Sequence, residues 1–128
     1  MNKIISLNRN EQFLQVYKKG KRTYHKNFTL HFLPNQLNTN RLGIKAGKKL
    51  AKAVRRNRVR RLIKEAYRLL KPELATGYDL VIVAKDSCLL ADSLAETMAA
   101  LQHLFKHAHL LSKDSGAQKK QAKQEASQ

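Results

Sequence analysis

The chain has 128 residues, the size of one domain, and 42% of them are hydrophobic, which is enough for a small core. Lys and Arg number 26 against 9 Asp and Glu, and the formal net charge of +17 favours a polyanionic partner. Cys88 is the single cysteine, which excludes an internal disulfide framework and a cysteine-rich zinc module. No apolar run approaches the roughly 20 residues that span a bilayer, so we expect a cytoplasmic protein without membrane contact.

The first predicted element is a helix over residues 10–19. Phe13, Val16 and Tyr17 lie three and four positions apart, which places them on one helical face. Gly20 follows the last periodic position, so the helix is expected to end there in a left-handed cap.

Extended segments follow this helix. Residues 22–34 alternate with the period of a strand, so two faces can be assigned. One face carries Phe28, Leu30 and Phe32, and the other carries Thr29, His31 and Leu33. The Asn-rich residues 35–40 predict a turn, after which residues 41–46 predict a further strand.

The second half of the chain predicts helix, strand and helix. A long helix is expected over residues 51–70, ending before Pro72. The apolar run Tyr78–Ala84 is typical of a central strand buried on both faces. A capping box at residues 93–96 starts a helix that reaches about residue 110. We therefore predict one α/β domain over residues 1–111 and a disordered basic tail over residues 112–128.

The long helix is strongly basic on one side. Residues 41–71 hold 13 of the 26 cationic side chains and one acid, Glu65. Measured from Val54, the apolar positions fall between about 60° and 180° around the helix; they are Ala51, Val59, Leu62, Ile63, Ala66, Leu69 and Leu70. The opposite side carries Asn57, Arg60, Arg61, Lys64, Arg68 and Lys71. Such a stripe is either a solvated face or a nucleic-acid contact, and its charge density favours the contact.

Arg55 breaks this pattern because it falls in the middle of the apolar arc. A core does not tolerate an unpaired arginine, so the first turn is expected to extend beyond the core. Arg55, Arg56 and Arg58 would then reach outward, where a planar guanidinium suits phosphate oxygens better than an ammonium does.

The sequence around Arg56-Asn57-Arg58 resembles the protein subunit of bacterial ribonuclease P. The resemblance runs over residues 8–108. It includes the Asn-Glu-Gln-Phe run that ends at Phe13, the segments 16–20 and 41–44, the lysine pair at 48–49 and the strand that begins at Asp79. It implies an α/β (α+β) two-layer sandwich in the order α-β-β-β-α-β-α, with a left-handed crossover into the last strand.

The resemblance also implies a function. The chain would be the protein component of an RNA-catalysed endoribonuclease that removes the 5′ leader of precursor tRNA. The catalytic RNA would hold Mg²⁺, and the protein would bind the leader and stabilise the complex, with no cofactor, no catalytic residue, no metal of its own and no obligate protein partner.

Carried over by position, the resemblance assigns two sets of binding residues. The leader-binding cleft would contain Phe13, Tyr17, Thr29 and His31. The surface for the catalytic RNA and tRNA would contain Lys48, Lys49, Lys52, Arg55, Arg56, Asn57, Arg58, Arg60, Arg61, Lys64 and Arg68. Unpaired bases stack on aromatic faces whatever their sequence, but from the residues alone core packing is the favoured interpretation of Phe13 and Tyr17. The chain departs from the family pattern at His31, Gly47 and Ala51.

Other constellations predict no chemistry of their own. The acids are scattered, so a two-metal nuclease site is not expected in the protein. His103 and His107 have ligand spacing, but they point away from the apolar stripe and are expected to be surface side chains. Cys88 is expected to be buried, and Asp79 either positions a cation or belongs to a turn.

Two other function classes compete with this interpretation. A small basic ribosomal RNA-binding protein would share the charge and the fold class, although it would not need the aromatic cleft. A DNA-binding regulator would need a two-helix reading motif with a short turn, which the segment before the basic stripe does not provide.

Overall fold

The computed structural model describes residues 4–47, 52–90 and 93–111. The elements in chain order are α1 (Asn10–Lys19), β1 (Lys21–Tyr24), β2 (Phe28–Pro34), β3 (Arg41–Lys45), α2 (Ala53–Leu70), η1 (Lys71–Glu73), β4 (Tyr78–Ala84), η2 (Asp86–Leu90) and α3 (Leu94–His107). This confirms the order α-β-β-β-α-β-α. The predicted tail at 112–128 lies outside the described residues.

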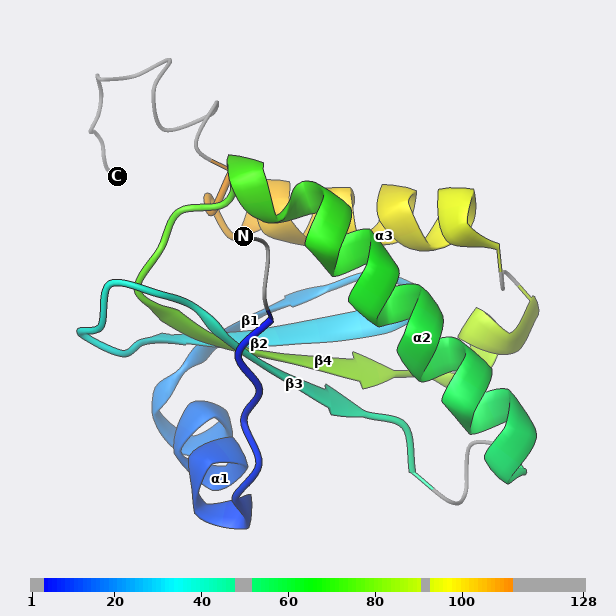
Figure 1. Ribbon diagram of the computed structural model, residues 1–128, viewed down its shortest axis with the longest axis horizontal. Coiled ribbons are helices and arrows are strands. Elements are labelled where there is room, and N and C mark those ends of the chain that lie inside the picture. Colours follow the sequence, from blue (N-terminus) through cyan, green and yellow to red (C-terminus); the bar gives the residue numbers. More distant parts are fainter. Residues whose placement is uncertain (1–3, 48–51, 91–92, 112–128) are drawn as a thin grey trace.

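The four strands form one mixed sheet in the order β1-β2-β4-β3. β2 is antiparallel to both of its neighbours, β1 and β4, whereas β3 and β4 are parallel. The chain leaves β3, crosses the sheet as α2 and returns to β4, and Figure 1 shows that this crossover is left-handed. The predicted extended segment 22–34 is in fact the β1–β2 hairpin, with its turn at residues 25–27.

The prediction that Tyr78–Ala84 is a central strand is confirmed. β4 lies between β2 and β3, and Leu80, Val81 and Ile82 are all at most 1% exposed although they point to alternate faces. A continuous apolar run is required at this position because helices cover both sides of the strand. In Figure 1, α2 and α3 lie on one face of the sheet and α1 lies on the other.

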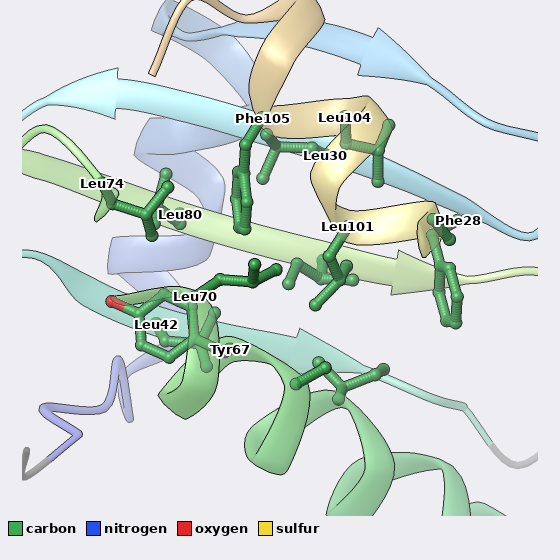
Figure 2. Packing of buried hydrophobic residues seen from close by; sticks show 14 of the residues in the cluster. Phe28, Leu30, Leu42, Tyr67, Leu70, Leu74, Leu80, Leu101, Leu104 and Phe105 are labelled. Atoms are coloured by element: carbon green, nitrogen blue, oxygen red, sulfur yellow. The ribbon is translucent and has the colours of Figure 1, made fainter. Parts of the chain in front are cut away.

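The main core fills the space between the sheet and the α2/α3 layer. Figure 2 shows Tyr67 and Leu70 of α2 and Phe105 of α3 directed toward Leu30 and Leu80 of the sheet. Burying each large apolar side chain stabilises the fold by about 1.5–3 kcal/mol. This layer therefore fixes the axis and the rotation of α2.

The rotation of α2 differs from the prediction. The helix begins at Ala53 and buries Val59, Ile63, Ala66, Tyr67 and Leu70. Tyr67 is 1% exposed, whereas Leu69, expected on the apolar face, is 41% exposed. The centre of the buried arc is turned by about 50° from the expected one, because Tyr67 packs against the sheet. Ala51 lies outside the described residues.

The end of α1 also differs from the prediction. Gly20 is not left-handed, since its φ is −83° and its ψ is 176°. A Cβ at Gly20 would lie 2.5 Å from the carbonyl oxygens of Phe32 and Val16. Close approach of the backbone to β2, and not a positive φ, therefore requires glycine here.

An N-terminal segment that the sequence analysis left unassigned extends the sheet. The amide of Leu7 donates to the carbonyl of Leu42 over 2.9 Å, and the amide of Leu42 donates to Ile5 over 2.8 Å. Residues 5–7 therefore lie beside the free edge of β3, and a parallel bridge joins Ser6 to Leu42. Leu7, 5% exposed, packs with Val16 and Val81 beneath α1.

The contacts of Asp79 show which of its two predicted roles, positioning a cation or forming a turn, applies. Nε and Nη2 of Arg41 each donate to the Asp79 carboxylate over 2.8 Å, and the Asn35 amide donates over 2.9 Å. Asp79 therefore holds a cation, and the hydrogen bond to Asp79 raises the pKa of Arg41. The network ties the β2–β3 loop to the beginning of β4.

The remaining expectations for side chains are confirmed. Cys88 is buried, and the exposed His103 and His107 rings lie side by side with centroids 4.2 Å apart. The Ser93 hydroxyl caps α3, accepting from the Glu96 amide over 3.1 Å. Among the described residues, no helix has the length and apolar character needed to cross a membrane.

Candidate nucleic-acid interface

The four residues assigned to the leader cleft come together on one face of the sheet. Thr29 and His31 alternate with the core residues of β2, so they point away from α2 and α3. Phe13 and Tyr17 lie one helical turn apart on α1, which packs over the same face. We call this surface, defined by Phe13, Tyr17, Thr29 and His31, the aromatic face.

Tyr17 and His31 are in direct contact. Their ring centroids are 4.8 Å apart and the planes meet at 74°, an edge-to-face arrangement. Burial raises the pKa of the Tyr17 phenol. Burial, followed by repulsion from Arg22, lowers the pKa of His31, so the imidazole is held in its neutral form at pH 7.

Phe13 lies at the β3 side of the aromatic face. A Cβ at Gly43 would lie 2.6 Å from the Phe13 ring, so the ring rests on bare backbone. The Lys45 ammonium lies 4.8 Å from the ring centroid, within the range of a cation–π contact. Lys45 is exposed, so a cation stands at the margin of the aromatic face.

Phe13 and Tyr17 combine core packing with partial exposure. Each ring packs against the small cluster of Leu7, Val16 and Val81, yet each remains partly exposed. Thr29 is only 8% exposed, so it forms the floor of the surface. The rings are therefore anchored by the core while part of each faces solvent.

The first turn of α2 extends beyond the core, as the position of Arg55 predicted. Val54 is 79% exposed, and Arg55 is exposed with its Nη2 donating to the carbonyl of Leu89 over 2.9 Å. Lys52 and Asn57 are exposed on the same end of the helix. Lys48 and Lys49 lie outside the described residues.

The cations of the α2 stripe differ in their contacts. Arg60 is half-buried and donates from Nη2 to the carbonyl of Ala46 over 3.3 Å. Arg68 forms a two-pronged ion pair with Glu65, with 3.0 Å between Nε and Oε1, and this hydrogen bond lowers the pKa of Glu65. Arg61 and Lys64 are exposed.

Arg56 does not reach outward as predicted, since it is half-buried and carries an unsatisfied donor. Its Nε is buried, and within the described part of the chain it has no hydrogen-bond partner. Leaving such a donor unpaired is unfavourable by about 1–3 kcal/mol.

A pocket of about 180 Å³ lies between the two surfaces, at the edge of β3 that residues 5–7 cover. Phe13 lines it from the α1 side, and Arg60 and Lys64 line it from α2. Leu7 and Ile44 supply apolar lining. The aromatic face and the basic side of α2 therefore meet around one edge of the sheet.

The structure adds residues that the sequence analysis did not select. Lys45 lies two positions after Gly43 on β3, so it points to the same side of the sheet and borders the aromatic face. Arg22 borders this face because it pairs with His31. Neither position could be assigned before the pairing of the strands was known. The described ranges contain no group of three His, Cys, Asp or Glu side chains that could hold a metal ion.

Comparison with known proteins gives consistent matches. A family described as Ribonuclease P matches residues 1–109. The ribonuclease P protein component of Alkaliphilus oremlandii is 40% identical over 111 residues, covering 87% of this chain and 96% of that protein.

Solved structures show the same fold. The Staphylococcus aureus RNase P protein matches with a TM-score of 0.77 at 27% identity, covering 85% of this chain and 99% of that one. The Thermotoga maritima RNase P protein matches with a TM-score of 0.74 at 28% identity, covering 80% and 96%. A further S. aureus structure is that of a mutant with defective mRNA degradation activity.

Proposed function

The chain belongs to the ribonuclease P protein family, and we propose that its aromatic face binds the single-stranded 5′ leader of precursor tRNA while the basic side of α2 contacts the catalytic RNA. As a member, it is the protein component of a ribonucleoprotein enzyme and assists the catalytic RNA in processing precursor tRNA. This membership decides against the ribosomal protein and the DNA-binding regulator.

The observation that carries the leader assignment is the arrangement of the Phe13, Tyr17 and His31 rings. All three are partly exposed on one sheet face, and Lys45 and Arg22 stand at its two sides. Unpaired bases stack on aromatic rings, and flanking cations bind the sugar–phosphate chain. Because every base has a flat face, stacking on such a surface tolerates different leader sequences.

The assignment of α2 to the catalytic RNA rests on charge. Arg60, Arg61 and Lys64 lie on one side of a helix whose apolar side is fixed in the core. Each phosphate contact with such a stripe releases counterions, so the affinity falls with salt.

The side chains that the structure describes offer no fitting site for the Mg²⁺ that the family implies. The acid nearest the aromatic face in the β register is Asp79, and Arg41 and Asn35 already occupy its carboxylate. Elsewhere in the described ranges no three ligand side chains converge. In this proposal the catalytic RNA holds the metal ions, and the protein contributes binding and electrostatic stabilisation.

Reconstitution tests this division of labour. Purified protein with Mg²⁺ alone should cleave neither precursor tRNA nor an unstructured mRNA fragment, because the described residues hold no carboxylate cluster. Adding the catalytic RNA at low Mg²⁺ should restore removal of the leader. Cleavage of precursor tRNA by protein freed of RNA and repurified would contradict the proposal, and cleavage of the mRNA fragment alone would reveal a second activity.

A further inference from the structure

Tyr24 is an exposed aromatic residue on the same side of the sheet as the aromatic face. Its side chain is 60% exposed on the edge strand β1. The Arg22 guanidinium lies 5.9 Å from the ring centroid, and the Lys85 ammonium lies 5.8 Å from it. Two cations therefore flank one solvent-facing ring.

The strand register places Tyr24 in line with the aromatic face. Tyr24 pairs with Thr29, Thr29 pairs with Val83, and Val83 pairs with Lys45. Directly paired residues point to the same side of a sheet. This row therefore crosses all four strands on the side of the sheet that carries α1. It spans about 14 Å from β1 to β3, at about 4.8 Å for each strand spacing.

The row lies immediately beside the one that α1 covers. One step along the strands, His31 pairs with Arg22 and with Val81, and Tyr17 packs on His31. Lys85 follows the end of β4, two positions after Val83, and so lies on the same side of the sheet. Its ammonium donates to the carbonyl of His25 over 2.8 Å. The Tyr24 row is therefore continuous with the aromatic face. It has cations at both ends, Lys45 on β3 and Arg22 with Lys85 beside Tyr24.

We propose that Tyr24 is a second base-stacking residue, which holds a leader nucleotide farther along the strand than those on Phe13 and Tyr17, with Arg22 and Lys85 beside its phosphates. The proposal rests on leader binding by the aromatic face. A flat exposed ring with two neighbouring cations matches the chemistry of single-stranded RNA, which presents a base face and a phosphate at every nucleotide. Leaders too short to reach β1 would gain nothing from Tyr24.

The experiment measures binding of precursor tRNAs with a graded series of leader lengths to the reconstituted complex of protein and catalytic RNA. Tyr24→Ala should weaken binding of the long leaders by about five- to tenfold, the lower part of the range for one stacked base. Tyr24→Phe keeps the ring and should stay within about twofold of the parent. Leu37→Ala, which truncates a 46% exposed side chain outside the strands, is the matched control and should change nothing.

Two further measurements locate the contact. In the second set of leaders, 2-aminopurine replaces one base at a time, and its fluorescence is quenched where the base stacks on the protein. Tyr24→Ala should abolish this quenching at one set of leader positions. The Phe13→Leu/Tyr17→Leu variant should abolish it at a different set. Arg22→Met should lower the salt slope for long leaders by about 0.7. Lys106→Met, which removes the same charge from exposed α3, should leave that slope unchanged.

The outcomes separate this inference from the proposed function. If the Phe13/Tyr17 variant loses its response to leader length and Tyr24→Ala does not, the proposed function stands and the role of Tyr24 is refuted. If Tyr24→Ala alone loses that response, the role of Tyr24 stands and the assignment of Phe13 and Tyr17 is wrong. Equal weakening of long-leader and leaderless substrates by Tyr24→Ala would also refute the inference.

Discussion

Single residues determine how the aromatic rings are presented, and Gly43 is the clearest case. A Cβ at this position would meet the Phe13 ring at 2.6 Å. Gly43→Ala should therefore displace the ring from β3 and destabilise the fold by about 1–3 kcal/mol, as overpacking does. Chemical denaturation measures the free energy of unfolding, and leader affinity should fall with it.

Gly47 provides the matched control for this substitution. Nothing described lies within 4 Å of a Cβ built there, so Gly47→Ala should leave stability unchanged or raise it by up to about 1 kcal/mol. Equal effects of the two substitutions would show that the contact with Phe13 does not constrain Gly43. The departure from the family pattern at Gly47 thus has no steric consequence among the described residues.

His31 should report on bound RNA through its pKa. In the free protein, NMR titration should give a pKa below the ordinary 6.5, because burial and then Arg22 disfavour the imidazolium. The folded state then binds fewer protons than the unfolded state, so stability should fall as the pH drops from 6.5 through the folded pKa. Phosphates of a bound leader favour the charged form and should raise this pKa. An unchanged His31 titration with saturating leader would remove His31 from the interface.

At the scale of elements, the basic side of α2 divides into engaged and exposed cations. Arg68 is paired with Glu65, whereas Arg61 is exposed. Arg61→Ala should lower the slope of log affinity against log salt for the catalytic RNA by about 0.7–0.9, the value for one phosphate contact. Arg68→Ala should lower it less, because Glu65 already neutralises that charge. A larger effect at Arg68 than at Arg61 would contradict this division.

The elements whose partners are local or whose pattern is unambiguous were predictable from the sequence. β4 has the predicted bounds because only a doubly covered strand needs an unbroken apolar run. The rotation of α2 was not predictable, since burial of Tyr67 depends on the space left by the sheet. Pairing of residues 5–7 with Leu42 was missed because it joins segments that are distant in the sequence.

The candidate site was predictable to a similar degree. Strand parity correctly placed Thr29 and His31 on one face, and helical spacing placed Phe13 with Tyr17. The sequence could not show that Arg68 is paired or that Lys45 lies over Phe13, because these depend on side-chain contacts and register. Tyr24 joined the same face only through its pairing with Thr29.

At the scale of the whole molecule, the sheet separates two surfaces that serve different RNAs in this account. α2 packs on one face and α1 on the other (Figure 1), and the pocket at the β3 edge lies between them. The core between the sheet and the α2/α3 layer fixes the position of α2 and so of its basic side. The smaller cluster under α1 fixes the position of the aromatic rings. Changes to the rings should therefore leave assembly with the catalytic RNA intact.

The most direct test of the central claim replaces both Phe13 and Tyr17 with Leu, which keeps apolar bulk and removes the flat rings. Affinity of the reconstituted complex is measured for precursor tRNA with a long leader and for leaderless tRNA, together with the melting temperature. Stacking contributes about 1–3 kcal/mol for each base, so the variant should lose a substantial part of that for the long-leader substrate alone. A lowered melting temperature with equal weakening of both substrates, or unchanged binding of both, would contradict the assignment of the aromatic face to the leader.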